Sequence, residues 1–124
     1  MEIKIPIKAL SVNRAWQGRR FKSSFYKQFE KDVTMLLPQA KRTITGEIEV
    51  YYTFYVKSYA LTDTDNLVKP IQDILTKRGY FKDDRQIVFY SAEKVRSNEE
   101  AIEIQILEYE KDLGKSKRRT TRRP

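Results

Sequence analysis

The chain has 124 residues, 40% of them hydrophobic, and a formal net charge of +8; this length suits one ordinary domain with a single core and leaves no room for a second. It contains no cysteine and no histidine, which excludes disulfides, thiolate metal sites and the catalytic schemes that depend on either side chain. Any metal would therefore be held largely by oxygen atoms, which favours magnesium, manganese or calcium over zinc.

The N-terminal residues predict a strand and a loop. Residues 2–7 alternate isoleucines with polar residues and proline, which is the period of a half-buried strand, and Pro6 places it at an edge or a strand end. Residues 11–21 combine turn formers, glycine and three arginines without a regular period and predict a loop.

A first amphipathic helix is expected to begin after Ser23 or Ser24, since either serine can cap it, and to end before Pro38. Its buried face is predicted to consist of the apolar residues that recur every four positions, joined by Tyr26 and Leu36: Phe25, Phe29, Val33 and Leu37.

The middle of the chain predicts a strand and a second helix. Residues 46–56 are rich in β-branched and aromatic residues and indicate a central strand. After a loop, a helix is expected to end at Gly79, with Pro70 in its first turn and Asp65 or Asn66 as its N-cap. One face of this helix is marked by Leu67, Ile71, Ile74, Leu75 and Arg78.

The C-terminal part predicts two strands and a tail. Residues 86–95 and 101–109 read as strands joined by a hairpin turn at residues 96–99, which gives an α+β fold, β-α-β-α-β-β, with a mixed sheet flanked by two helices. This single domain is expected to span residues 1–110. Residues 111–124 hold seven basic residues and one acidic residue and so contribute +6 of the net charge. They predict a disordered tail that attracts nucleic acid through counterion release, or one that only aids solubility.

Two acidic clusters flank the second helix. Asp63 and Asp65, at i and i+2 in extended backbone, project to the same side and can converge on one cation just before the helix begins. Asp84 can reach the same neighbourhood if the strand after the helix pairs beside the strand before it. Lys69 lies on the helical face of Asp65, and Asp73 lies one turn further along.

Such a group of acids and a lysine suits phosphodiester cleavage. A hydrated magnesium ion would neutralise the carboxylates, polarise the scissile phosphate and lower the pKa of a bound water, while the lysine stabilises charge on the phosphoryl oxygens. The residues alone leave a second interpretation open, in which Asp63 and Asp65 are loop and capping residues, Asp73 forms surface ion pairs, and residues 83–84 are a turn.

The segment DTDNLVKPIQDILTKRGYFKDDRQIV, residues 63–88, resembles the central motif of the RusA family of Holliday junction resolvases. That motif is D-x-D-N-x-x-K, then an acid and a leucine on a helix, then glycine and an apolar pair before Asp-Asp. Residues 11–16 are similar to the family's S-x-N-x-x-aromatic segment, so the resemblance spans most of residues 1–109. The matching positions of the central motif are Asp63, Asp65, Asn66, Lys69, Asp73, Leu75, Gly79, Asp83, Asp84, Gln86 and Ile87.

The resemblance implies a RusA-like fold and a homodimer that binds branched DNA and resolves four-way junctions by paired nicking in recombination and repair. It implies Mg²⁺, with Mn²⁺ as a possible substitute, held by Asp63, Asp65 and Asp84, and a catalytic role for Lys69 beside these three. The family's best-known member has aromatic residues shortly before the first aspartate, thought to wedge into the junction. This chain has residues 59–62, YALT, at that place.

In this chain, Tyr59 or Leu61 would take the role of the aromatic wedge. Other predicted contacts with DNA combine phosphate-binding cations with a ring able to stack on a base, and they are Asn13, Arg14, Trp16, Arg19, Arg20 and Lys22. The alternative interpretation, without a role in DNA binding, is that this segment is a solvated loop with Trp16 packed on the core.

Other functions remain open. One is a non-catalytic, dimeric nucleic-acid-binding protein whose aspartates are structural. Another is a PD-(D/E)xK nuclease, whose nearest candidate residues, Glu93 and Lys94, are adjacent and would point to opposite faces of a strand. The N-terminus lacks the apolar core of a signal peptide and no apolar run approaches a membrane span. We therefore expect a cytoplasmic protein without a membrane partner, bacterial or phage-encoded and associated with the nucleoid.

Overall fold

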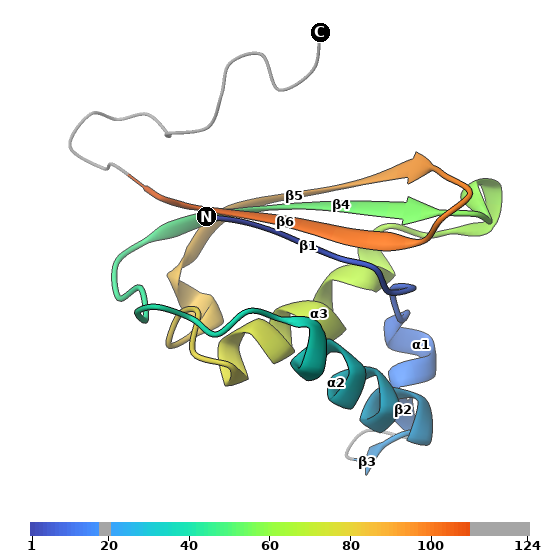
Figure 1. Cartoon of the computed structure of the whole chain (residues 1–124), viewed down its shortest axis with the longest axis horizontal. Coiled ribbons are helices and arrows are strands. Elements are labelled where there is room, and N and C mark those ends of the chain that lie inside the picture. Colours follow the sequence, from blue (N-terminus) through green and yellow to red (C-terminus); the bar gives the residue numbers. More distant parts are fainter. Residues whose placement is uncertain (18–20, 110–124) are drawn as a thin grey trace, which may run out of the picture.

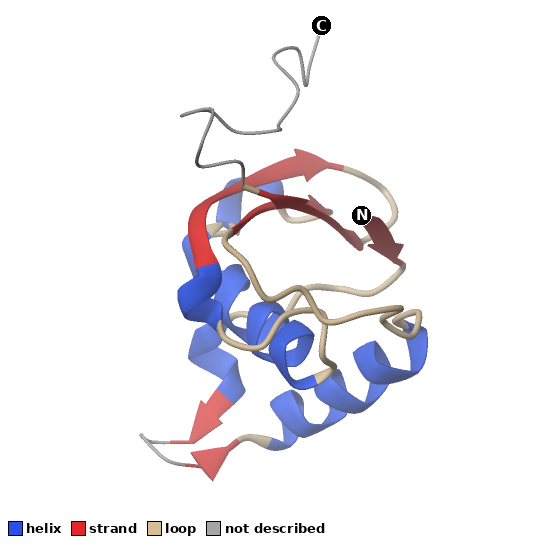
Figure 2. Cartoon of the chain, turned by 90° about the vertical axis from the view of Figure 1, so that its left-hand side faces the viewer, coloured by secondary structure: helices blue, strands red, loops and turns tan. Residues whose placement is uncertain are grey.

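Four strands form one mixed sheet in the order β1-β6-β4-β5. In this computed structural model, which describes residues 1–17 and 21–109, the α-helices lie on one face of the sheet (Figure 1, Figure 2). An α+β fold with a mixed sheet is thereby confirmed. The strands are β1 (Glu2–Ile5), β4 (Ile48–Val56), β5 (Ile87–Arg96) and β6 (Ala101–Glu108), and the helices are α1 (Val12–Ala15), α2 (Ser24–Leu36) and α3 (Asp65–Lys77).

Short elements fill the predicted loops. Strands β2 (Trp16–Gln17) and β3 (Phe21–Lys22) pair with each other outside the main sheet, and 3-10 turns form at η1 (Tyr59–Leu61) and η2 (Asp84–Gln86). The prediction of a plain loop over residues 11–21 is therefore wrong, since α1, β2 and β3 all lie there. Elements of two to four residues are too short to display a hydrophobic period, which is why the sequence did not reveal them.

Strand β4 is buried on both faces. On the helix side, Val50, Tyr52 and Phe54 belong to the core cluster. On the opposite face the Tyr51 hydroxyl donates to Glu49 at 2.6 Å, so that part of this buried polar surface is hydrogen-bonded. The strand buried on both sides occupies an inner position of the sheet, as predicted.

The pairing of the last two strands differs from the prediction. Strand β5 pairs in parallel with β4, and β6 pairs with β4 in antiparallel fashion, so β4 lies between them. The predicted hairpin at residues 96–99 is therefore wrong: the connection crosses over β4. The apolar β4 offers a pairing edge on each side, and both later strands use it. The condition set for Asp84, that the strand after the helix pairs beside the one before it, is met.

Helix α2 begins after Ser23, whose side chain accepts the N–H of Tyr26 at 3.2 Å. It ends before Pro38, as predicted. Two face assignments are wrong: Phe25 is 52% exposed, because Tyr26 takes the core position in the first turn, and Leu36, in the last turn, is 43% exposed. The buried residues of the helix are Tyr26, Phe29 and Val33.

Helix α3 connects β4 to β5 and buries the predicted apolar face, except Arg78, which is exposed at the helix end. Gly79 follows with φ +82°, the left-handed conformation expected of a C′ glycine. The helix starts earlier than expected, with Thr64 as N-cap, so Pro70 lies in the second turn and not in the first. Its missing N–H leaves the carbonyl of Asn66 without the usual helical bond.

Several predictions fall outside the described residues: Arg19, Arg20 and the basic tail of residues 111–124. Of Trp16, only the backbone placement in β2 is described. Across residues 1–17 and 21–109, no helix has both the length and the apolar character needed to span a membrane.

The cap of α2 yields a stability prediction. The Ser23 hydroxyl donates to the Arg14 carbonyl and accepts from Tyr26, and Ser23 is only 4% exposed. Ser23→Ala should therefore lower the free energy of unfolding by about 1–2 kcal/mol in urea denaturation, because a partly buried carbonyl and a helix N–H lose their partner. Ser24→Ala is the matched control one residue along, where Ser24 is exposed. Equal losses in both variants would contradict the assignment of the cap.

Candidate active site

The first acidic pair lies where β4 gives way to α3. The segment before Asp63 is pinned to β5 by Lys94, whose ammonium donates to the carbonyls of Tyr59 at 2.6 Å and of Thr62 at 3.0 Å. The Tyr59 ring lies under Lys94 at 4.4 Å and under Arg96 at 4.8 Å. Lys94 therefore supports the acidic loop through its backbone, a use that differs from the PD-(D/E)xK interpretation.

Asp63 and Asp65 differ in their surroundings. The Asp63 carboxylate accepts the backbone N–H of Asp65 and the side-chain amide of Asn66, both at 3.3 Å. These bonds agree with the interpretation of Asp63 as a capping residue, although they use only part of its accepting capacity. Asp65 is exposed in the first turn of α3, and its carboxylate has no hydrogen bond or ion pair within the part of the chain described. The carboxylate of Asp65, together with the remaining lone pairs of the Asp63 carboxylate, can therefore still bind a cation.

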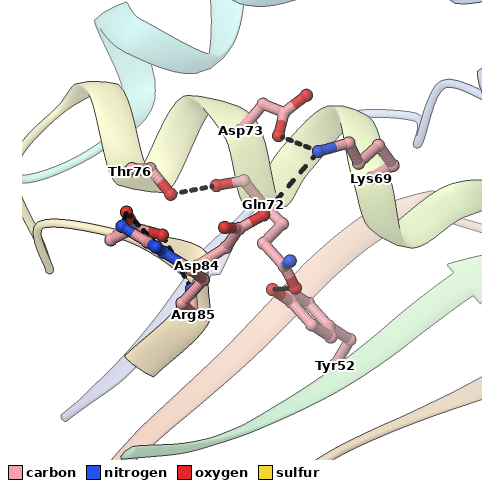
Figure 3. A network of polar contacts seen from close by, with 8 residues as sticks. Tyr52, Lys69, Gln72, Asp73, Thr76, Asp84 and Arg85 are labelled. Carbon is pink, nitrogen blue, oxygen red and sulfur yellow. Dashed lines mark hydrogen bonds and ion pairs between the residues drawn. The ribbon is translucent and has the colours of Figure 1, made fainter. Parts of the chain in front are cut away.

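Lys69, one turn further along α3, joins two acids (Figure 3). Its ammonium lies 2.9 Å from Asp73 and 3.7 Å from Asp84. The hydrogen bond to Asp73 is the main reason that the pKa of Lys69 is raised above its usual value, with both carboxylates adding attraction. Lys69 is therefore a cation throughout the physiological pH range, and it is half exposed, within reach of a ligand.

Asp84 owes its position to a capped turn. Asp83 accepts the backbone N–H of Arg85 and, with Gln86, forms a capping box around η2. The Gln86 amide also donates to the carbonyls of Ile44 and Gly46, both at 2.8 Å. The Arg85 side chain holds the pKa of Asp83 at about 2. These bonds make residues 83–86 a defined turn, as the alternative interpretation expected, and they present Asp84 to α3.

A buried contact underlies the same part of α3. The hydroxyl of Tyr52, on β4, donates to Gln72 at 2.9 Å (Figure 3). Burial raises the pKa of Tyr52 far above its usual value, so this hydroxyl stays protonated. Gln72 directly precedes Asp73 in α3. Its hydrogen bond to Tyr52 therefore attaches to the sheet the part of α3 that carries Lys69 and Asp73.

The structure does not gather the predicted metal ligands in one place. Among residues 1–17 and 21–109, no three acidic side chains are grouped closely enough to hold a metal ion. Asp63 and Asp65 follow β4, whereas Asp84 precedes β5, and in a parallel pair these points belong to opposite ends of the sheet. Along the axis of α3, Asp65 and Asp73 are separated by about 12 Å at the usual helical rise. The acids thus form two pairs, with Lys69 between them.

The donor chemistry nevertheless fits a hard divalent cation. The donors beside the acidic pair are oxygens of carboxylates, carbonyls and the hydroxyls of Thr62 and Thr64, and magnesium is commonly held by one or two carboxylates together with water and substrate phosphate. The pair of Asp63 and Asp65 meets that need without a third acid. Convergence of Asp63, Asp65 and Asp84 on one ion stays a prediction.

The predicted DNA-binding residues divide between two pockets. Asn13 and Arg14, exposed on α1, line a pocket of about 490 Å³ that reaches Asp63. Lys22 lines a second pocket of about 380 Å³ that reaches Asp73 and Asp84. Each acidic pair therefore opens onto a pocket that carries at least one of the predicted cations.

Sequence reasoning missed a cluster beside Asp84. The Glu30 carboxylate binds Lys77 and also lies 3.5 Å from Lys22, so it brings two ammonium groups together. The hydrogen bond to Glu30 raises the pKa of Lys77. Lys82 lines the same pocket. The contact joins residues 47 positions apart, so no local spacing in the sequence indicated it.

The α+β scaffold thus presents exposed carboxylates, a fixed lysine and nearby cations, which are the groups that phosphodiester chemistry uses. The comparison with known proteins is more specific. Residues 7–107 match the family described as endodeoxyribonuclease RusA. The chain therefore belongs to the RusA family, and the predicted family is confirmed.

One curated relative matches part of the chain. The crossover junction endodeoxyribonuclease rusA of Lactococcus phage r1t is 50% identical over 46 residues, which are 37% of this chain and 35% of the relative. The match thus spans about a third of the relative's length.

Proposed function

We propose that this chain is a magnesium-dependent DNA endonuclease that resolves four-way junctions by paired nicking in recombination and repair. The observation that carries the proposal is the placement of Lys69, held by Asp73 and Asp84 one turn from the free carboxylate of Asp65. Membership of the RusA family and the name of the phage relative support the choice of DNA as the substrate.

The proposed metal ligands follow from the family motif, and the role of Lys69 follows from the position of its side chain. Asp63, Asp65 and Asp84 would hold Mg²⁺, with Mn²⁺ as a substitute. When bound, the ion polarises the scissile phosphate and lowers the pKa of a water molecule. Lys69 stabilises negative charge on the phosphoryl oxygens, since its ammonium stays protonated and is fixed in place by Asp73.

The cations around the site would hold the DNA backbone. We assign phosphate contacts to Lys22, beside Asp73 and Asp84, and other contacts with DNA to Asn13 and Arg14, in the pocket that reaches Asp63. Trp16, Arg19 and Arg20 join them as proposed DNA contacts in the adjoining segment. The protein would work in the cytoplasm of a bacterium, close to the nucleoid, where branched DNA arises.

Paired nicking requires two sites, and a twofold homodimer supplies them. We propose β5 as the dimer interface. It is an edge strand of the sheet, and three consecutive residues on it are exposed apolar side chains: Val88, Phe89 and Tyr90. Long apolar edges of this kind readily pair with another chain.

A second candidate is a non-catalytic, dimeric DNA-binding protein. It is favoured by the structural bonds of Asp63 to the start of α3 and of Asp83 to η2. In that case the acids would fix the backbone and the cations alone would act on DNA.

Cleavage of a synthetic four-way junction separates the two candidates. With Mg²⁺ we expect paired nicks, and with EDTA none. Asp65→Asn should reduce the rate by about 100-fold or more, because the free carboxylate is lost. Lys69→Ala should cause a similar loss while the affinity for the junction measured in EDTA falls less than about tenfold.

Two controls sit on α2 away from the acids: Asp32→Asn matches the acid variant and Lys27→Ala matches the lysine variant, and both should cleave at the wild-type rate. Equal product with Mg²⁺, with EDTA and from Asp65→Asn would contradict the proposed chemistry. Junction binding without any cleavage would establish the non-catalytic candidate.

The interface is tested by sedimentation. Val88→Lys should convert a dimer to a monomer, because a charged side chain on an edge strand opposes pairing with a second edge. Met35→Lys is the control, since Met35 is also an exposed apolar residue, at 76%, but lies on α2. A Val88→Lys protein that sediments as a dimer would rule out β5 as the interface.

A further inference from the structure

The pocket that reaches Asp63 differs in character from the acids beside it. It lies among α1, the start of α2, the end of β4 and η1, and has a volume of about 490 Å³, within the range of small-ligand sites. Its lining contains both charged and apolar side chains. The charges balance, with Lys8 and Arg14 against Asp63 and Glu100, so the interior does not favour a phosphate over a neutral group.

The apolar part of the wall is formed by side chains that the core does not use. Phe25 is 52% exposed, since Tyr26, Phe29 and Val33 are the residues of α2 that pack inward. Leu61, on η1, is 89% exposed. Exposed apolar side chains that line a pocket together with a few polar groups suit a ligand with an apolar face.

Phe25 is also oriented. The guanidinium of Arg14 lies 4.3 Å from the centre of its ring, a cation–π contact between α1 and α2. Both groups are planar, and both are surfaces on which nucleobases stack. This contact prepares a stacking surface before any ligand arrives.

Polar groups complete the wall. Ser11, Asn13 and Asn66 contribute a hydroxyl and two amides, which can meet the donors and acceptors on the edge of a base. A neutral, flat, heteroaromatic ring with polar edges matches the charge balance, the stacking surface and these groups together.

We propose that this pocket takes one unstacked nucleobase of the DNA substrate, with Phe25 and Arg14 as its stacking surface. The inference rests on the proposed function and deepens it, because it gives the site a means of selecting branched DNA. Drawing a base out of an intact duplex costs stacking and pairing energy, and that cost is lower where pairing is already disturbed, as at a branch point. Since Asp63 shares the pocket, the bound base would also fix how far from the branch point the strand is cut.

The test measures binding in EDTA, so that cleavage plays no part. The dissociation constants of a four-way junction and of a duplex with the same arm sequences give a preference ratio. Phe25→Ala should lower this ratio about tenfold, the loss expected for one base–aromatic stack. Phe25→Tyr should keep it, since the ring remains.

Met35→Ala, on the same helix and 76% exposed, is the matched control and should keep the ratio too. A 4-thiothymidine at the branch point should crosslink to residues of the pocket, whereas the same nucleotide within an arm should not. Because Phe25 is half exposed, the thermal unfolding midpoint of Phe25→Ala should stay close to that of the wild type.

A wild-type preference for junctions that survives in Phe25→Ala, or branch-point crosslinks that map outside the pocket, would overturn the pocket and leave the proposed nuclease intact. A wild-type chain that nicks no junction and binds junction and duplex alike would overturn both.

Discussion

The burial of β4 on both faces is the constraint on which the rest of the structure depends. Its two edges pair with β5 and β6, and because β5 runs parallel to β4, the chain leaves the sheet after β4, crosses in α3 and returns as β5. That crossover separates the acids that follow β4 from the acid that precedes β5. Helix α3 spans the gap, and Lys69 on its outer surface is within reach of Asp84. The same crossover therefore supports both acidic pairs and divides them.

The proposed chemistry is consistent with this division. Asp65 carries a free carboxylate at the start of α3, where the helix dipole favours negative charge. Asp73 and Asp84 neutralise the charge of Lys69. A substrate phosphate that bound the ammonium group of Lys69 would therefore replace one of these carboxylates as its partner. Pockets with cations lie beside the start and the end of the helix. Such a layout would suit the proposed DNA substrate if a strand lay along α3, with its phosphates near Lys69 and a base toward Phe25.

Much of the fold followed from the sequence, because it depended on local signals. Apolar periods gave α2, α3 and the central position of β4, and the short spacing of Asp63, Asp65 and Lys69 placed them on one helix start. Features that depend on contacts between residues far apart in the sequence could not be predicted from it. Both later strands pair with β4 instead of forming the expected hairpin, and Tyr26 is buried in place of Phe25. The Glu30 contacts with Lys22 and Lys77 likewise exist only after α2, α3 and β3 have packed.

The central claim, that the carboxylates beside α3 form a divalent-cation site, is tested most directly by adding Mn²⁺ to ¹⁵N-labelled protein and recording paramagnetic line broadening. The account predicts that the amides around Asp63 and Asp65 broaden first, that the amide of Asp84 is also affected, and that Asp65→Asn weakens the effect at a given Mn²⁺ concentration. Broadening centred elsewhere on the chain, or unchanged by Asp65→Asn, would contradict it.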